Sequence, residues 1–195
     1  MISEEKWEKI WTGCKRFRIE QKESEFKELF QFLDKHFEGN IKNVLEIGSC
    51  AGGSSFGWSS IAENVLSINL DYIGATYPQL QIEKPNLNYY IGNSHTEETF
   101  LKIRELLDYK QVDFLFIDGG HDRGEALQDF RMFSKLVKSG GIVAFHDILP
   151  SHHHHIQNCW VDEDWEVLKK EFKTFDITHD EIANPWASLG ILYID

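Results

Sequence analysis

The chain has 195 residues, of which 42% are hydrophobic and 13% are aromatic. This composition supplies enough apolar material for a globular core and excludes intrinsically disordered and collagen-like proteins. Acidic residues number 32 against 20 basic ones, which gives a formal net charge of -12. Because this excess repels phosphate backbones, we expect no nucleic-acid partner.

The cysteines and the N-terminal residues indicate the cellular compartment. Cys14, Cys50 and Cys159 are far apart and form no CxxC pair, so the sequence predicts neither a disulfide framework nor a zinc ribbon. The first ten residues are acidic and lack the apolar core of a signal peptide. No apolar run approaches the ~20 residues that cross a bilayer. We therefore expect a cytoplasmic protein with no membrane partner.

The first 38 residues are predicted to form a helical extension. Its apolar side chains recur at helical spacing, on one face, at Phe26, Leu29, Phe30, Leu33 and Phe37. Gly39 and Asn40 end the pattern. The sequence thus divides into a helical extension at 1–38 and a larger domain at 39–195, and the extension is a candidate surface for a homodimer.

Beyond residue 39, short apolar runs alternate with amphipathic segments. Strands are predicted at 43–49, 65–71, 87–92, 112–118 and 142–147, and helices at 55–63, 96–109, 125–138 and around Trp165. Two last strands, near 175–179 and 189–194, have no long helix between them. The predicted fold class is α/β: a doubly wound Rossmann-like sheet of about seven strands, mostly parallel with an antiparallel C-terminal hairpin, and helices on both faces. Ligands of such sheets bind at the carboxyl ends of the strands.

A glycine-rich turn, EIGSCAGGSS, follows the first strand. Cys50 stands where a dinucleotide-binding fingerprint has its second glycine, and no GxxxxGK[ST] phosphate loop occurs. Glu46 is a poor neighbour for phosphates and a good one for an ammonium group. The turn therefore favours a cofactor with a positively charged end, although it could also be a tight strand-to-helix turn capped by Ser54 or Ser55.

Five segments together resemble a known family. They read VLEIGSCAGGSS, IGNSHTEET, VDFLFIDGGHDRGEALQDF, LVKSGGIVAFHDI and LGILYI. The chain resembles, over roughly residues 21–195, the class I S-adenosylmethionine-dependent methyltransferases. Within that class it is similar to the small-molecule branch of macrocin-type sugar O-methyltransferases and cephalosporin hydroxylase-like proteins. The resemblance implies S-adenosylmethionine as the cofactor.

The resemblance also implies which residues contact the cofactor. Asn69 takes the place of the family's ribose-binding acid, and Asp71, two residues on, is the alternative. Asn93 replaces a second acid, in the loop beside the adenine. The full implied set is Glu46, Gly48, Ser49, Gly52, Asn69, Asp71, Asn93, Ser94 and Asp118.

Two aspartates are predicted to share a divalent cation. Asp118 and Asp147 end adjacent strands, which in a sheet lie ~4.8 Å apart. Carboxylates that close repel each other unless they share a cation or a proton, and their oxygens suit Mg²⁺ or Mn²⁺. His146 is a third candidate ligand, whose nitrogen suits manganese, iron or zinc better than magnesium. Against this, neighbours on a strand alternate faces, Asp118 could cap a helix, and Asp147 could form an Asx turn.

His121 is the candidate general base. It lies in the turn DGGHD, three residues after Asp118, and an imidazole can accept a hydroxyl proton near neutral pH. The resembling sugar methyltransferases have their proposed base at this position; a metal-ligand or purely structural role is the alternative. The run His152–His155 is interpreted as variable loop sequence.

These observations predict an S-adenosylmethionine-dependent methyltransferase that performs metal-assisted O-methylation of a small-molecule hydroxyl, such as that of a sugar. Two alternatives stay open. One is a metal-dependent hydroxylase-like enzyme on the same fold, and the other is a catalytically inactive nucleoside-binding domain.

Overall fold

A computed structural model describes residues 2–71, 77–179 and 188–195. One seven-stranded sheet runs through it in the order β3-β2-β1-β4-β5-β7-β6. The strands are β1 (Ile41–Ile47), β2 (Ala62–Asn69), β3 (Leu87–Ile91), β4 (Val112–Ile117), β5 (Val137–His146), β6 (Thr174–Thr178) and β7 (Ser188–Tyr193). β1 to β5 pair in parallel, and β7 is antiparallel to both β5 and β6. The predicted fold class is confirmed, with β7 inserted between β5 and β6.

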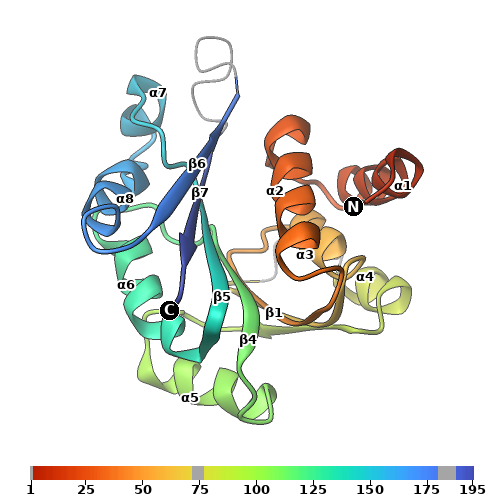
Figure 1. The fold of residues 1–195 in the computed structure, drawn as a ribbon. Helices are drawn as coiled ribbons and strands as arrows, with labels where there is room; N and C mark the ends of the chain where they lie inside the picture. The colour runs from red at the N-terminus through yellow and green to blue at the C-terminus, as the bar shows by residue number, and fades with distance from the viewer. Residues whose placement is uncertain (1, 72–76, 180–187) are drawn as a thin grey trace.

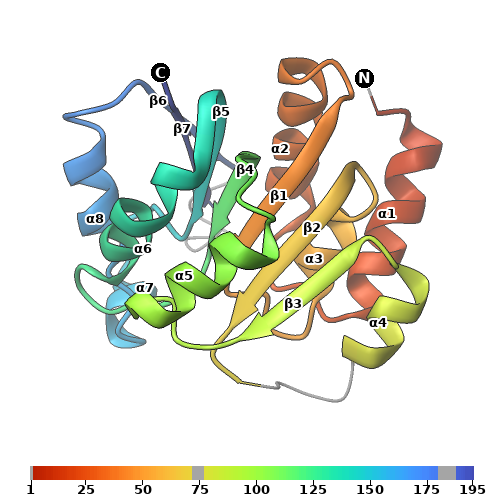
Figure 2. The ribbon, with the colours of Figure 1, turned by 90° about the horizontal axis from the view of Figure 1, so that it is seen from below.

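Helices cover both faces of the sheet (Figures 1 and 2). α1 to α4 lie on one face, and α5, α6 and α8 lie on the other. The helices are α1 (Glu4–Arg16), α2 (Glu23–His36), α3 (Gly53–Trp58), α4 (Tyr77–Glu83), α5 (Glu97–Leu106), α6 (Glu125–Phe133), α7 (His152–Ile156) and α8 (Val161–Leu168), and a 3-10 turn spans Ser134–Leu136.

Several predicted boundaries were wrong. The helix expected at 55–63 ends at Trp58, because β2 already begins at Ala62, where it pairs with Ile41. The strand expected after Gly140 and Gly141 begins before them, since β5 runs from Val137. Residues 152–155, expected to be a loop, belong to α7, where the Ser151 hydroxyl caps the helix by accepting from the backbone N–H of His154.

The predicted apolar face of the N-terminal extension is buried against the sheet. Phe26, Leu29, Phe30 and Leu33 of α2 are fully buried. The ring of Phe30 stacks on Trp58 at 4.9 Å between centroids, and these side chains share one hydrophobic cluster with residues of β1, β4 and β5. Burying each such side chain stabilises the fold by about 1.5–3 kcal/mol, so α2 is firmly packed against the sheet.

No helix within residues 2–71, 77–179 and 188–195 is both long and apolar enough to cross a membrane.

Candidate active site

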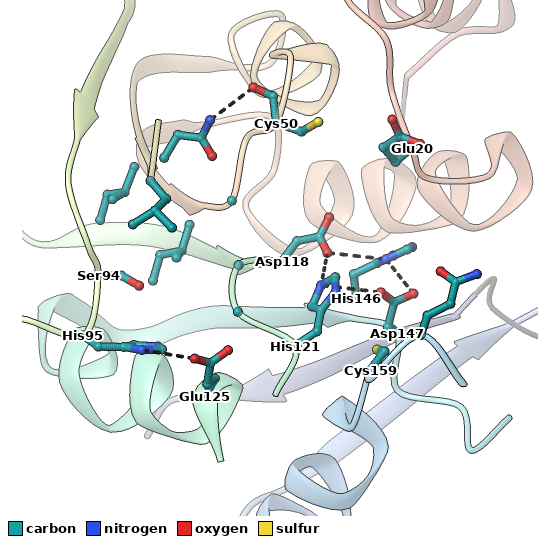
Figure 3. Close-up of a pocket in the computed structure, with 18 of the residues that line it drawn as sticks. Glu20, Cys50, Ser94, His95, Asp118, His121, Glu125, His146, Asp147 and Cys159 are labelled. Atoms are coloured by element: carbon teal, nitrogen blue, oxygen red, sulfur yellow. Dashed lines mark hydrogen bonds and ion pairs between the residues drawn. The ribbon is translucent and has the colours of Figure 1, made fainter. Parts of the chain in front are cut away.

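A cavity of about 700 Å³ opens at the carboxyl ends of the central strands (Figure 3). The segment between α1 and α2 contributes to its wall, through Glu20 and Lys22. Eight of the predicted site residues line it: Gly48, Asn69, Asn93, Ser94, Asp118, His121, His146 and Asp147. The strand ends expected to form one site therefore do meet in space.

Gly48 lies where the ends of β1 and β4 approach each other closely. Its φ is +86°, and a side-chain carbon built there would overlap the backbone carbonyl of Asp118. The position therefore requires glycine because of the neighbouring backbone, in addition to any space that a ligand would use.

Glu46 lies beneath the cavity and does not line it. Its carboxylate is fully buried and accepts hydrogen bonds from the hydroxyls of Ser55 and Ser67 and from Trp58 Nε1, the last at 2.8 Å. Burial raises the pKa of Glu46, and these hydrogen bonds oppose the rise. Glu46 thus supports the glycine turn through Ser55 and Trp58 of α3, and its predicted contact with a cofactor stays a prediction.

The two candidates for a ribose contact, at the end of β2, have different surroundings. Asn69 lines the cavity, and its amide donates to the backbone carbonyls of Asp71 and Cys50 at 2.8 and 3.3 Å. Asp71 is exposed and lies outside the lining, so of these two residues Asn69 is the one that faces the cavity.

Ser49 and Gly52, also predicted to contact the cofactor, lie outside the lining as well. The Ser49 hydroxyl hydrogen-bonds the Tyr77 hydroxyl at 2.5 Å. Gly52 takes a left-handed φ of +96° as the N-cap of α3. Both residues shape the turn, and their predicted contacts with the cofactor stay predictions.

The backbone conformation of Asp147 brings three predicted metal ligands together. The β4–β5 register pairs Ile117 with Phe145, so the next step along both strands brings Asp118 beside His146. Strand alternation would send Asp147 to the opposite face. Asp147 instead adopts a φ of +60°, in the left-handed region that costs a non-glycine residue about 1–2 kcal/mol. Its carboxylate thereby turns back toward His146.

The resulting cluster has closely spaced donor atoms (Figure 3). His146 Nδ1 lies 3.0 Å from Asp147 Oδ1 and 3.6 Å from Asp118 Oδ1, and the three donors all lie within 4.8 Å of one another. Burial alone would lower the pKa of His146, but Asp147 and Asp118 outweigh it and hold that pKa well above its ordinary value. Burial would likewise raise the pKa of both aspartates, and the His146 charge instead lowers them.

His121 stands beside the same carboxylates. Its Nε2 lies 3.4 Å from Asp118 Oδ1 and 3.6 Å from Asp147 Oδ2. Burial would lower the pKa of His121, but the hydrogen bond and charge of Asp118, together with Asp147, raise it. The His121 backbone carbonyl accepts from the N–H of Trp160 at 2.8 Å, which fixes the turn that carries the ring.

Two residues of the N-terminal extension reach the cluster, and sequence reasoning missed both. Gln21 Nε2 donates to Asp118 Oδ2 at 2.5 Å, and Glu25 Oε1 lies 3.1 Å from His146 Nε2. Their partners are 97 and 121 positions away in the chain. No local motif marks them, because Gln21 resembles an ordinary polar residue before an amphipathic helix and Glu25 an ordinary charged residue within it.

The interpretation of the histidine run as variable loop sequence was also wrong. His154 is 5% exposed, lines the cavity and places Nε2 3.4 Å from Asp147 Oδ1. Cys159, another residue that the motifs did not indicate, has donor atoms within 4.8 Å of His121 and Asp147. Burial raises the pKa of the Cys159 thiol to about 12, so this thiol is protonated at neutral pH.

Comparison with known proteins identifies the family. A family model described as a methyltransferase domain matches residues 45–148, more than half of the chain and the part that builds the cavity. The chain belongs to this methyltransferase family. A curated relative, uncharacterized protein R132 of Acanthamoeba polyphaga mimivirus, is 25% identical over 127 residues. That match covers 61% of this chain and 57% of the relative, so the methyltransferase spans little more than half the length of the relative.

Solved O-methyltransferases share the fold. One from Bacillus cereus, in complex with SAH, has a TM-score of 0.65 at 13% identity, covering 99% of this chain and 92% of that one. TomG of Streptomyces achromogenes, in complex with SAM, has a TM-score of 0.66 at 15% identity, covering 98% and 90%. MycE of the mycinamycin biosynthetic pathway, in complex with Mg, SAH and mycinamycin VI, has a TM-score of 0.54 at 14% identity, covering 84% and 48%.

Proposed function

We propose that this methyltransferase transfers the methyl group of S-adenosylmethionine to a hydroxyl of a small molecule, such as a sugar, with the help of a divalent cation. The observation that carries the proposal is the convergence of Asp118, His146 and Asp147 on the cavity that Gly48 and Asn93 also line. Those residues predicted to bind the cofactor that line this cavity, here called the cofactor wall, thus share it with the carboxylate cluster.

The residues of the cofactor wall suit a nucleoside with a positively charged end. The cavity combines a close-approach glycine, Gly48, with the amides of Asn69 and Asn93 and the Ser94 hydroxyl. The chain has no phosphate-binding loop, and its acidic net charge favours a cationic ligand over a dinucleotide. The SAM and SAH complexes of TomG and the Bacillus cereus enzyme support the same cofactor.

The cluster of Asp118, His146 and Asp147 suits a divalent cation. Two carboxylates face one imidazole at 3.0 and 3.6 Å, and a cation would neutralise their repulsion as the His146 proton does in the free chain. A cation held there supplies a Lewis acid toward an acceptor hydroxyl. The Mg in the MycE complex supports such a role.

His121 would receive the hydroxyl proton. Its Nε2 lies on the side of the cluster where both aspartates are within 3.6 Å. These aspartates raise the pKa of His121 against the effect of its burial. A cation between the carboxylates would reduce that rise and return the ring toward its neutral, proton-accepting form. Asp118 and Asp147 would then orient the ring and stabilise the charge it gains.

Ligand binding is the first test. S-adenosylmethionine and S-adenosylhomocysteine should each raise the thermal midpoint, because a ligand of the native state stabilises it. NAD should not. A rise with NAD alone would refute the cofactor assignment.

The reaction is tested with a panel of hydroxylated acceptors, sugars included, and mass spectrometry of the products. Transfer of a methyl group adds CH₂ to the acceptor, whereas a hydroxylase would add oxygen. Activity should vanish in excess chelator and return with Mg²⁺ or Mn²⁺. Undiminished turnover in chelator would refute the cation, and cofactor binding without turnover on any acceptor would indicate a nucleoside-binding domain.

His121→Ala should lower the rate of transfer by roughly 10²- to 10⁴-fold, the usual contribution of a general base. Its affinity for S-adenosylmethionine, measured by calorimetry, should stay within about twofold. The control is His152→Ala, which alters an exposed histidine of α7 that does not line the cavity. Equal rates in the two variants would mean that another group removes the proton.

A further inference from the structure

The ring of His146 is oriented by a buried carboxylate. Glu25 is fully buried, and its Oε1 accepts from the Lys22 backbone N–H at 2.8 Å. We take the contact of 3.1 Å with His146 Nε2 as a bond in which Nε2–H donates to the same oxygen. This fixes Nδ1 as the nitrogen that faces Asp118 and Asp147.

His154 is oriented in the same way by a backbone carbonyl. Its Nδ1 lies 3.1 Å from the carbonyl oxygen of Leu149, which can only accept, so Nδ1 carries the proton. The other nitrogen, Nε2, is buried and has no hydrogen-bond partner among the described residues. It lies 3.4 Å from Asp147 Oδ1, the same oxygen that His146 Nδ1 approaches at 3.0 Å.

Both rings have the arrangement of metal-ligating histidines, which usually donate their second ring N–H to a carboxylate or a backbone carbonyl. On the basis of the proposed cation site, we infer that His154 is a further ligand of the cation. We also infer that this cation is a first-row transition metal in preference to magnesium. Its donors would be the oxygens of Asp118 and Asp147 and Nδ1 of His146, which lie within 4.8 Å of one another, joined by Nε2 of His154, which lies 3.4 Å from Asp147 Oδ1. Imidazole favours manganese through zinc, whereas Mg²⁺ prefers oxygen donors and retained water.

Glu25 is a positioning residue in this site, since it acts through the tautomer of His146. Outer partners of this kind contribute about 10- to 100-fold to metal affinity. The N-terminal extension therefore takes part in metal binding, although it supplies no ligand itself.

Metal titration of the chelator-treated full chain tests the inference without any turnover. Co²⁺ and Mg²⁺ affinities are measured by calorimetry for the wild type and for His154→Asn, His152→Asn and Glu25→Gln. The wild type should bind Co²⁺ at least about tenfold more tightly than Mg²⁺. His154→Asn should reduce this ratio by about tenfold or more by weakening Co²⁺ binding, whereas His152→Asn, on the exposed side of the same helix, should keep it. Glu25→Gln should weaken Co²⁺ binding by about tenfold or more and shift the visible absorption of the bound ion.

A measurement on the wild type guards against variants that fold poorly. The electron paramagnetic resonance of bound Cu²⁺ should show coupling to two imidazole nitrogens, and to one in His154→Asn. Equal Co²⁺ and Mg²⁺ affinity in the wild type, an unchanged ratio in His154→Asn, or one imidazole in the wild-type spectrum would overturn the inference. These outcomes are separate from the proposed function: methyl transfer supported by Mg²⁺ with a single imidazole would keep that function and refute the nitrogen-rich site alone.

Discussion

Replacing Gly48 with alanine should destabilise the fold through two effects that can be separated. Gly48 has a φ of +86°, so any side chain there costs about 1–2 kcal/mol of left-handed strain. The new carbon would also overlap the Asp118 carbonyl. The backbone of both strand ends is hydrogen-bonded to neighbouring strands, and forcing them apart costs a further 1–3 kcal/mol or so, as overpacking does. The expected loss for Gly48→Ala is therefore about 2–5 kcal/mol.

Gly124→Ala is the matched control, since Gly124 has a φ of +81° and open space around its would-be side chain. It should lose only the strain, about 1–2 kcal/mol. Urea unfolding of the wild type and both variants measures the free energies at fixed slope. The difference between the variants, about 1–3 kcal/mol, corresponds to roughly 2–12 °C in thermal midpoint for a chain of this size. If Gly48→Ala loses no more than Gly124→Ala, the steric reasoning is refuted.

Two other substitutions probe buried charge. Trp58→Phe removes the indole N–H that donates to Glu46 at 2.8 Å and should lower the free energy of unfolding by about 1–3 kcal/mol in urea titration; a loss below measurement error would contradict a bonded Glu46. His95, which lies 3.3 Å from buried Asp129, has a pKa raised first by its bond to Asp129. A raised folded pKa means that the stabilisation is complete below the unfolded pKa of about 6.5 and is lost as pH rises through the folded value. His95→Gln should therefore lose most stability relative to wild type near pH 5–6, with a difference that shrinks toward pH 8–9; a constant difference, or one matched by His152→Gln, would contradict the pairing.

The sheet could be predicted because its strands carry a simple signal. All six residues of β4 are buried, and its last four, Phe114 to Ile117, form an apolar run, so Asp118 stands out where the run stops. The buried face of α2 could likewise be predicted, from the helical spacing of its apolar residues. These features depend on hydrophobic periodicity, which is a local property of the chain.

The surroundings of the site could not be predicted for specific physical reasons. Strand alternation gave no orientation for His146 and Asp147, because a single left-handed φ at Asp147 overrides it. Four identical histidines contain no periodicity, so nothing in the run distinguishes buried His154 from its exposed neighbour His152. Glu25 resembles a solvated helical charge, and only the packing of α2 against the sheet turns it inward.

The position of β7 has a consequence for the order in which the chain folds. Among the described strands, β6 pairs with β7 alone, and β7 also occupies the free side of β5. A nascent chain that has made β6 but not yet Ser188–Tyr193 therefore has no place to dock β6, and its longest strand, β5, has an open apolar edge. Such an edge is a template for pairing with another chain, and contacts that form late expose folding intermediates to aggregation. The chain is thus open to pairing with another chain at this edge until β7 takes its place beside β5.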